Sequence, residues 1–292
     1  MNTPPTRADH RPLELIAATS QMLWGMPAVL NFFLGGLGAG FYVAAAALGA
    51  PGAMTLAAWL APALVLTGFA AVACEAGRPL RGLRVLGGVA TSWMSRELWL
   101  GSLFVLLALA EDAVPWTGLR LPVVVAAVAL VLAQGAVLTH ARAIAAWSVP
   151  MMPVVFGAAA AVSGVALVVL ADLMTGGLPG EALLGTTLTV LAVGMLVWLA
   201  FLASSSDRAF VRATAPLRRG ATAIEVIVAG YVAPLALITL ALAFPAWASG
   251  PTALAAILAL VGQFRARSAL ILTAGQRRPV TLATLTLRRR SA

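Results

Sequence analysis

Charged residues, histidine and cysteine are scarce in this chain of 292 residues, and lysine is absent. Charged residues make up 10% of the sequence, against roughly 25% in a soluble domain. A soluble fold could not cover a chain that is 61% hydrophobic with so few charges, so lipid must be the solvent for much of it. The single cysteine, Cys74, excludes an intramolecular disulfide and a cysteine-ligated cluster within the chain.

Histidine is limited to His10, in the polar N-terminal segment, and His140. A haem b inside a membrane usually has two axial histidines that face each other across helices. Because His10 lies outside the apolar runs, we expect no haem of this kind. A redox role would then need an external or a diffusible cofactor.

Apolar runs of about 18 or more residues predict an all-α polytopic membrane protein with about eight transmembrane helices. No connection between the runs is long enough for a soluble domain. We therefore expect a single membrane domain, with an N-terminal segment over 1–23, an eight-helix bundle over 24–272 and a basic tail over 273–292. The predicted spans are 26–48, 54–74, 96–109 (short unless Met94 and Ser95 belong to it), 121–140, 151–171, 183–202, 224–244 and 252–261, the last of which can continue to 272.

The basic residues, all of them arginine, are distributed unevenly over the connections. Of the 19 arginines, all except Arg120 fall on one side of the predicted bundle or in the segments assigned to the two ends of the chain. The positive-inside rule then puts both termini in the cytoplasm, with the bacterial inner membrane as the expected location. Because these arginines alternate with membrane spans, we expect contacts with lipid head groups or a partner protein and no nucleic-acid role.

Asn31 is a polar residue within the first predicted span, which is also rich in glycine. Small residues such as Gly36 and Gly40 let another helix approach closely, which is the simplest interpretation of the glycines. An amide in lipid needs a hydrogen-bond partner, so Asn31 is a candidate for a binding role.

The densest group of charges lies where the second predicted span ends and the third begins. It contains two carboxylates, Glu75 and Glu97. Charges at a membrane boundary often act only as topology signals. However, a quinone needs hydrogen-bond partners for its carbonyl groups and a group that exchanges protons, and a carboxylate near an arginine can supply both. The arginines of this group are Arg78, Arg81, Arg84 and Arg96.

His140 ends the fourth predicted span on the same side, and Arg142 follows it. A lone histidine at an interface is more often structural than chemical, but its position beside the arginine-rich face makes it a candidate. Asp207 and Glu225 lie near other arginines, and we expect them to form ion pairs.

Four stretches carry a resemblance to a known family. They are WG-x-P-x(3)-N-x(2)-LGGLGAG at 24–40, E-x-GRPLR at 75–81, SWMSRE at 92–97 and AWS-x-P at 146–150. In this order they resemble the membrane-anchor subunits of molybdopterin oxidoreductases, over essentially the whole chain. The family is that of the dimethyl sulfoxide reductase anchor, related more distantly to the polysulfide reductase and nitrite reductase (NrfD-type) anchors.

The resemblance implies eight helices with no bound redox group or iron–sulfur cluster of their own. It also implies a pocket for ubiquinone or menaquinone, near the face where an iron–sulfur subunit docks and in turn contacts a molybdopterin catalytic subunit. Arg81 and Glu97 match positions implicated in quinol binding in the dimethyl sulfoxide reductase anchor. Glu75 stands where that anchor has a histidine, although a carboxylate can also handle protons.

We therefore expect an anchor that passes electrons between the iron–sulfur subunit and membrane quinone, with no substrate active site or metal site of its own. Among relatives with cytoplasmic soluble subunits, we expect a sulfite dehydrogenase, which oxidises sulfite and reduces quinone. Reductases of sulfoxides, polysulfide, thiosulfate or tetrathionate are alternatives in anaerobic or sulfur respiration. The candidate residues for quinone binding and proton transfer are Glu75, Arg81, Glu97, Asn31 and His140, and those for partner docking are Arg78, Arg84, Arg96 and Arg142.

Two functions of other classes compete with this expectation. A secondary transporter would carry a charged site near the middle of the bilayer and an internal repeat. The sequence shows no clear repeat, and its charges are concentrated near the predicted boundaries of the spans. A purely structural anchor would have the same helices without a quinone site.

Overall fold

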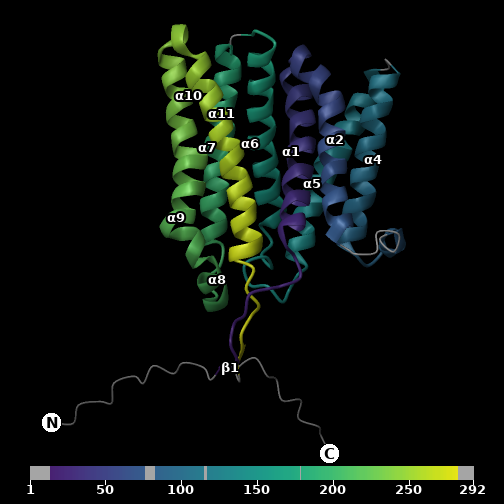
Figure 1. The fold of residues 1–292 in the computed structure, drawn as a ribbon, viewed down its shortest axis with the longest axis vertical. Helices are drawn as coiled ribbons and strands as arrows, with labels where there is room; N and C mark the ends of the chain where they lie inside the picture. Colours follow the sequence, from purple (N-terminus) through teal and green to yellow (C-terminus); the bar gives the residue numbers. More distant parts are fainter. Residues whose placement is uncertain (1–13, 76–82, 115–116, 178, 282–292) are drawn as a thin grey trace, which may run out of the picture.

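The computed structural model describes residues 14–75, 83–114, 117–177 and 179–281, and it confirms the all-α membrane architecture. Eight helices in this part of the chain are long and apolar enough to cross a membrane, and they lie side by side in one bundle (Figure 1). They are α1 (Met26–Leu48), α2 (Pro51–Glu75), α4 (Trp93–Ala113), α5 (Arg120–Thr139), α6 (Met152–Met174), α7 (Glu181–Ala203), the run of α9 (Gly220–Ala223), η3 (Ile224–Val232) and α10 (Ala233–Ala243), and α11 (Ser249–Ser268) with η5 (Ala269–Thr273).

Local sequence explains where several of these helices begin and end. Pro27 lies in the first turn of α1. Backbone N–H groups at that position have no acceptor within the helix, so proline removes no hydrogen bond there. Gly49 ends the same helix with φ of 60°, a left-handed conformation that favours glycine. The third span begins at Trp93 and so includes Met94 and Ser95, whose hydroxyl donates to the Val85 carbonyl at 2.5 Å. The eighth span extends to Thr273, beyond the last predicted residue.

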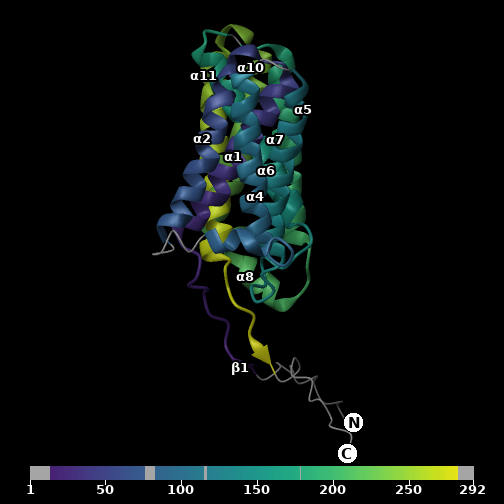
Figure 2. The same ribbon diagram turned by 90° about the vertical axis from the view of Figure 1, so that its right-hand side faces the viewer.

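The spans form two halves of four helices with the same neighbour order. In the first half, α1 and α4 each contact α2 and α5; in the second half, α6 and α10 each contact α7 and α11. The first helices of the two halves, α1 and α6, meet at the centre (Figures 1 and 2). The structure thus reveals a repeat of packing that the sequence does not show, because many different apolar residues can fill equivalent positions.

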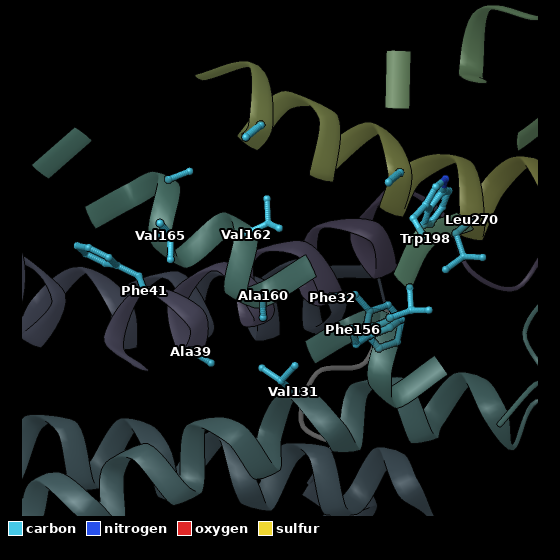
Figure 3. Packing of buried hydrophobic residues seen from close by; sticks show 14 of the residues in the cluster. Phe32, Ala39, Phe41, Val131, Phe156, Ala160, Val162, Val165, Trp198 and Leu270 are labelled. Atoms are coloured by element: carbon cyan, nitrogen blue, oxygen red, sulfur yellow. The ribbon is translucent and has the colours of Figure 1, made fainter. Parts of the chain in front are cut away.

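Glycine brings α1 and α6 into direct backbone contact near the middle of both helices. A Cβ atom on Gly40 would clash with the Ala160 carbonyl, and one on Gly164 would clash with the Gly40 carbonyl. About two turns closer to the start of each helix, the rings of Phe32 and Phe156 pack edge to face at 5.6 Å (Figure 3). The predicted close packing at the glycines of the first span is therefore confirmed.

The end of the bundle where α1 begins is called the arginine-rich end here. The connection over 204–223 contains an amphipathic helix there, α8 (Arg208–Arg218), which buries Phe210 and Leu217. Arg265 and Arg267 lie within α11, so the eighth span runs beyond 261 and follows its longer predicted form, which continues to 272. The described chain also has short helical turns at η1 (Leu83–Gly88), η2 (Thr117–Leu119) and η4 (Pro245–Trp247).

The segments that flank the bundle pair with each other, although the sequence presents them as two separate segments. β1 (Glu14–Ile16) and β2 (Val280–Thr281) form a short antiparallel ladder beyond the arginine-rich end. The backbone N–H of Gln21 donates to the Gly275 carbonyl at 2.7 Å, which continues the pairing toward the bundle. The ends of the described chain are therefore held together next to the same face.

Trp147 connects this pairing to the bundle, and its replacement provides a stability test. Its ring stacks on Trp24 at 5.0 Å, and its buried Nε1 donates to the Leu270 carbonyl at 2.8 Å. We expect Trp147→Phe to lower the free energy of unfolding by about 1–3 kcal/mol, because the carbonyl loses its buried partner. Thermal unfolding in detergent measures the change. Trp59→Phe, at a tryptophan exposed on α2, is the control, and equal stability of the two variants would contradict the assignment.

Candidate functional site

The candidate site is a buried polar cluster of Asn31, Glu97 and Gln134, called the Glu97 cluster below. Its members come from α1, α4 and α5, and they are 7%, 5% and 0% exposed. Asn31 Nδ2 donates to Glu97 Oε1 at 2.8 Å, and Gln134 Nε2 donates to the same oxygen at 3.2 Å. The structure thus brings together two of the predicted site residues and adds Gln134.

Glycines on neighbouring helices make room for this cluster. A Cβ atom on Gly35 would clash with the Gln134 amide, and one on Gly68 would lie 3.1 Å from the Asn31 Cα. The cluster lies four or five residues inside the spans at the arginine-rich end, or about 6–8 Å at the rise of an α-helix. A carboxyl group is therefore held within the membrane-spanning part of the first half.

Two oxygen atoms of the cluster have no hydrogen-bond partner within the described part of the chain. They are Asn31 Oδ1 and Gln134 Oε1, and both are buried. Unpaired buried acceptors are unfavourable, and in native structures they commonly bind a water, a ligand or an exchangeable proton. The cluster can therefore accept hydrogen bonds from a ligand that carries hydroxyl groups.

An apolar groove of about 350 Å³ lies between α1, α5, α6 and α7, and its lining residues do not include members of the cluster. Val131 lines it, one turn from Gln134 on α5, and Ala160 lines it from α6. A Cβ atom on Gly36 would lie 3.8 Å from Gln134 Oε1 and 3.9 Å from the Ala160 Cβ, so Gly36 lies between the unpaired oxygen and a residue that lines the groove. The exposed Val128 and Leu132 also line the groove, which therefore opens to the lipid-facing surface.

Glu75 lies outside the Glu97 cluster, at the last residue of α2. Its side chain is exposed, and Oε1 would lie 3.0 Å from a Cβ atom on Gly25, just before α1. Glu75 and Gly68 are seven residues apart on α2, or about 10 Å, so Glu75 lies nearer the membrane boundary than Asn31. Arg78 and Arg81 lie outside the described residues, as does the side chain of Arg84, whose backbone belongs to η1.

His140 is not part of the cluster either. It caps α5 with an exposed side chain, and its Nε2 accepts from Trp93 Nε1 at 3.1 Å. Its Nδ1 lies 2.8 Å from the Ala136 carbonyl, which requires the proton on Nδ1. These contacts join the ends of α4 and α5 and give His140 a structural role at the arginine-rich end.

The candidates for partner docking differ in their contacts. Arg96 donates to the carbonyls of Val89 and Ala90 at 2.9 and 2.8 Å, and it lies over the Trp93 ring. Its guanidinium group therefore orders the connection before α4. Arg142 has an exposed side chain and is available to a partner.

The remaining acidic residues with ion pairs lie near both ends of the bundle. As predicted, Asp207 pairs with Arg278 at 2.5 Å and Glu225 with Arg265 at 2.5 Å. At the opposite end, Glu111 pairs with Arg120 at 3.0 Å and also accepts from the buried Tyr42 hydroxyl. None of these carboxylates contacts the Glu97 cluster through a hydrogen bond in the described chain.

Gln134 is the site residue that sequence reasoning missed. It is the one polar residue between Leu121 and Leu138, in the middle of a predicted span, and a polar amide in such a run could have marked it. Comparison of the chain with models of known protein families and with curated proteins finds no match. The assignment of the candidate site is therefore supported by its geometry and by the motifs in the sequence.

Proposed function

We propose that this chain is the quinone-binding membrane-anchor subunit of a multi-subunit oxidoreductase. The observation that carries this proposal is the buried Glu97 cluster, together with an apolar groove whose lining comes within about one turn of Gln134 on α5. A quinone consists of a ring with two oxygen atoms and a long isoprenoid chain, so its site needs polar groups next to an apolar channel. The cluster, which lies within the first half of the bundle, supplies the polar groups. The groove, which lies where the first half meets the second, supplies the apolar channel.

The proposed roles follow from the contacts of each residue. Asn31 Oδ1 and Gln134 Oε1 accept hydrogen bonds from the hydroxyl groups of a quinol, and the Glu97 carboxyl takes up or releases a proton. Glu75 exchanges protons with water at the boundary. A bound quinone would supply two-electron, two-proton redox chemistry, which the side chains of this chain lack. The groove holds the first part of the isoprenoid chain.

The proposed partners are an iron–sulfur subunit and a molybdopterin subunit, and the support for them is the resemblance of the four motifs. The described arginines outside the bundle interior concentrate at the end nearest the Glu97 cluster, which suits docking of a redox partner there. With that end in the cytoplasm of a bacterium, both termini are cytoplasmic. Sulfite oxidation coupled to quinone reduction is the proposed reaction of the complex.

The arrangement of the two halves bears on the alternative of a secondary transporter. Parallel repeats occur in transporters, whose substrate sites lie between the repeats near the middle of the bilayer. Here Gly40 and Gly164 bring the two halves into backbone contact at that depth, and the neighbouring groove is lined by apolar residues except for Thr186. The charged candidate, Glu97, lies within one half, which favours the quinone-binding function.

Quinone binding by the purified chain in lipid nanodiscs tests the proposal. We expect saturable binding of short-chain ubiquinone or menaquinone analogues, with affinity lowered about tenfold or more by Gln134→Leu, because an acceptor is lost. Gln263→Leu, at a buried glutamine of the second half, is the matched control and should retain wild-type affinity. A lack of saturable binding, or equal losses in both variants, would sink the proposal; a structural anchor predicts the first of these. Molybdenum and iron in the co-purified complex test the proposed partners.

A further inference from the structure

A second buried polar group lies in the other half of the bundle, around Arg267. Arg267 is only 6% exposed on α11, and its guanidinium carbon lies 3.5 Å from the centre of the Phe156 ring. No carboxylate of the described residues lies within ion-pair distance of it; the nearby Glu225 binds Arg265 instead, at 2.8 and 2.5 Å. An arginine within a membrane span normally pairs with an opposite charge or faces a polar cavity, so Arg267 needs a further ligand.

Three hydrogen-bond donors around Arg267 have no partner in the described chain. They are Arg267 Nε, Gln263 Nε2 and Trp198 Nε1, and all are buried. The three residues come from α11 and α7, and they line one cavity. Figure 3 labels Trp198, which belongs to α7, and Leu270, which belongs to the last span. Because the three unpaired atoms are donors, the missing ligand must be an acceptor.

The cavity limits the size of this ligand. Its volume is about 10 Å³, which is the space of a single water-sized particle, so a somewhat larger monoatomic ion enters only when the surrounding side chains move slightly outward. Apart from the three donors, it is lined by Tyr231 and by aliphatic or small residues of α6, α7 and α11. Tyr231 belongs to the π-helical segment η3, a type of distortion that is common at functional sites. A nucleotide, a quinone ring or a lipid head group is too large for this space.

We propose that this cavity binds one small monoatomic anion, with chloride as the physiological ligand. Chloride accepts several hydrogen bonds, donates none and balances the charge of the guanidinium group. A water molecule would place its own two hydrogens among donors and would leave the buried charge unbalanced. The bound anion connects α7 to α11 through Trp198 and Arg267 and so stabilises the second half. This site does not depend on the proposed quinone function.

Halide binding to the purified full-length chain tests the proposal. The protein is prepared in sodium gluconate and titrated with sodium chloride or bromide at constant ionic strength, while its Tm is followed. We expect a saturable rise in Tm with either halide and none with further gluconate, because a ligand that binds only the folded state stabilises it. Crystals grown in bromide should give one anomalous peak between Trp198, Gln263 and Arg267.

Two variants distinguish an anion site from a general salt effect. Trp198→Phe keeps an aromatic ring and removes one N–H donor, and Arg267→Met removes the charge. We expect the halide concentration at half-saturation to rise about tenfold for Trp198→Phe, because one hydrogen bond to a charged group is lost. For Arg267→Met we expect no halide response. Arg142→Gln, at an exposed arginine, should respond as the wild type does. An unchanged response in Trp198→Phe, or a bromide-free cavity that contains only water, would overturn the proposal.

Discussion

Replacing Glu97 with glutamine is expected to lower the rate of quinone-linked electron transfer by about 10²-fold or more. Glutamine has nearly the same shape as glutamate and can still accept hydrogen bonds from Asn31 Nδ2 and Gln134 Nε2. It cannot exchange a proton, so the proposed reaction loses its proton acceptor while the fold remains. The measurement is the turnover of the purified complex with a quinone analogue and with a soluble electron acceptor that bypasses the membrane subunit.

The control for this prediction is Glu225→Gln, at another carboxylate near the arginine-rich end. Glu225 is exposed and paired with Arg265, and an exposed ion pair contributes about 0–1 kcal/mol, so this variant should keep both stability and turnover. The bypass reaction should be unchanged in both variants. Wild-type quinone turnover in Glu97→Gln would remove Glu97 from proton transfer, and an equal loss in the two variants would indicate a general effect of charge.

Adding a single methyl group at Gly164 is expected to lower the free energy of unfolding by about 3 kcal/mol or more. The new Cβ would overlap the backbone of Gly40 on α1, and neither backbone can move away without separating the two halves of the bundle. A flexible side chain could rotate away from such a contact, whereas a carbonyl within a helix cannot. Gly164→Ala should therefore unfold at a lower temperature and give less folded protein.

Gly157→Ala is the matched control on the same helix. Gly157 has no atom within 4 Å of an added Cβ, since it lines the groove, and alanine is a better helix former than glycine by about 1 kcal/mol. This variant should be as stable as the wild type or slightly more so. Thermal unfolding and the yield of monodisperse protein compare the two substitutions. Equal behaviour would mean that α1 and α6 do not meet at Gly40 and Gly164.

The helices and part of the site could be predicted from the sequence because each follows from a local property. Apolar length identified the spans, and a polar residue in the first span identified Asn31. The charge group at the start of the third span identified Glu97, although it could not show which neighbours turn toward it. Its partners depend on how α1, α4 and α5 rotate against one another, and Gly35 and Gly68 allow the close approach of α1 to α5 and to α2.

By itself, the sequence determined that this protein is a bundle of about eight membrane helices, with its arginines concentrated toward one end. These properties depend on the composition and length of each segment, because each segment partitions between lipid and water according to its own hydropathy and flanking charges. Only the tertiary structure decided that Asn31 and Glu97 meet Gln134, that Glu75 and His140 remain at the boundary, and that Arg267 is buried. Such contacts join residues up to about a hundred positions apart, and they depend on side-chain volumes at helix crossings, which hydropathy along the chain does not encode.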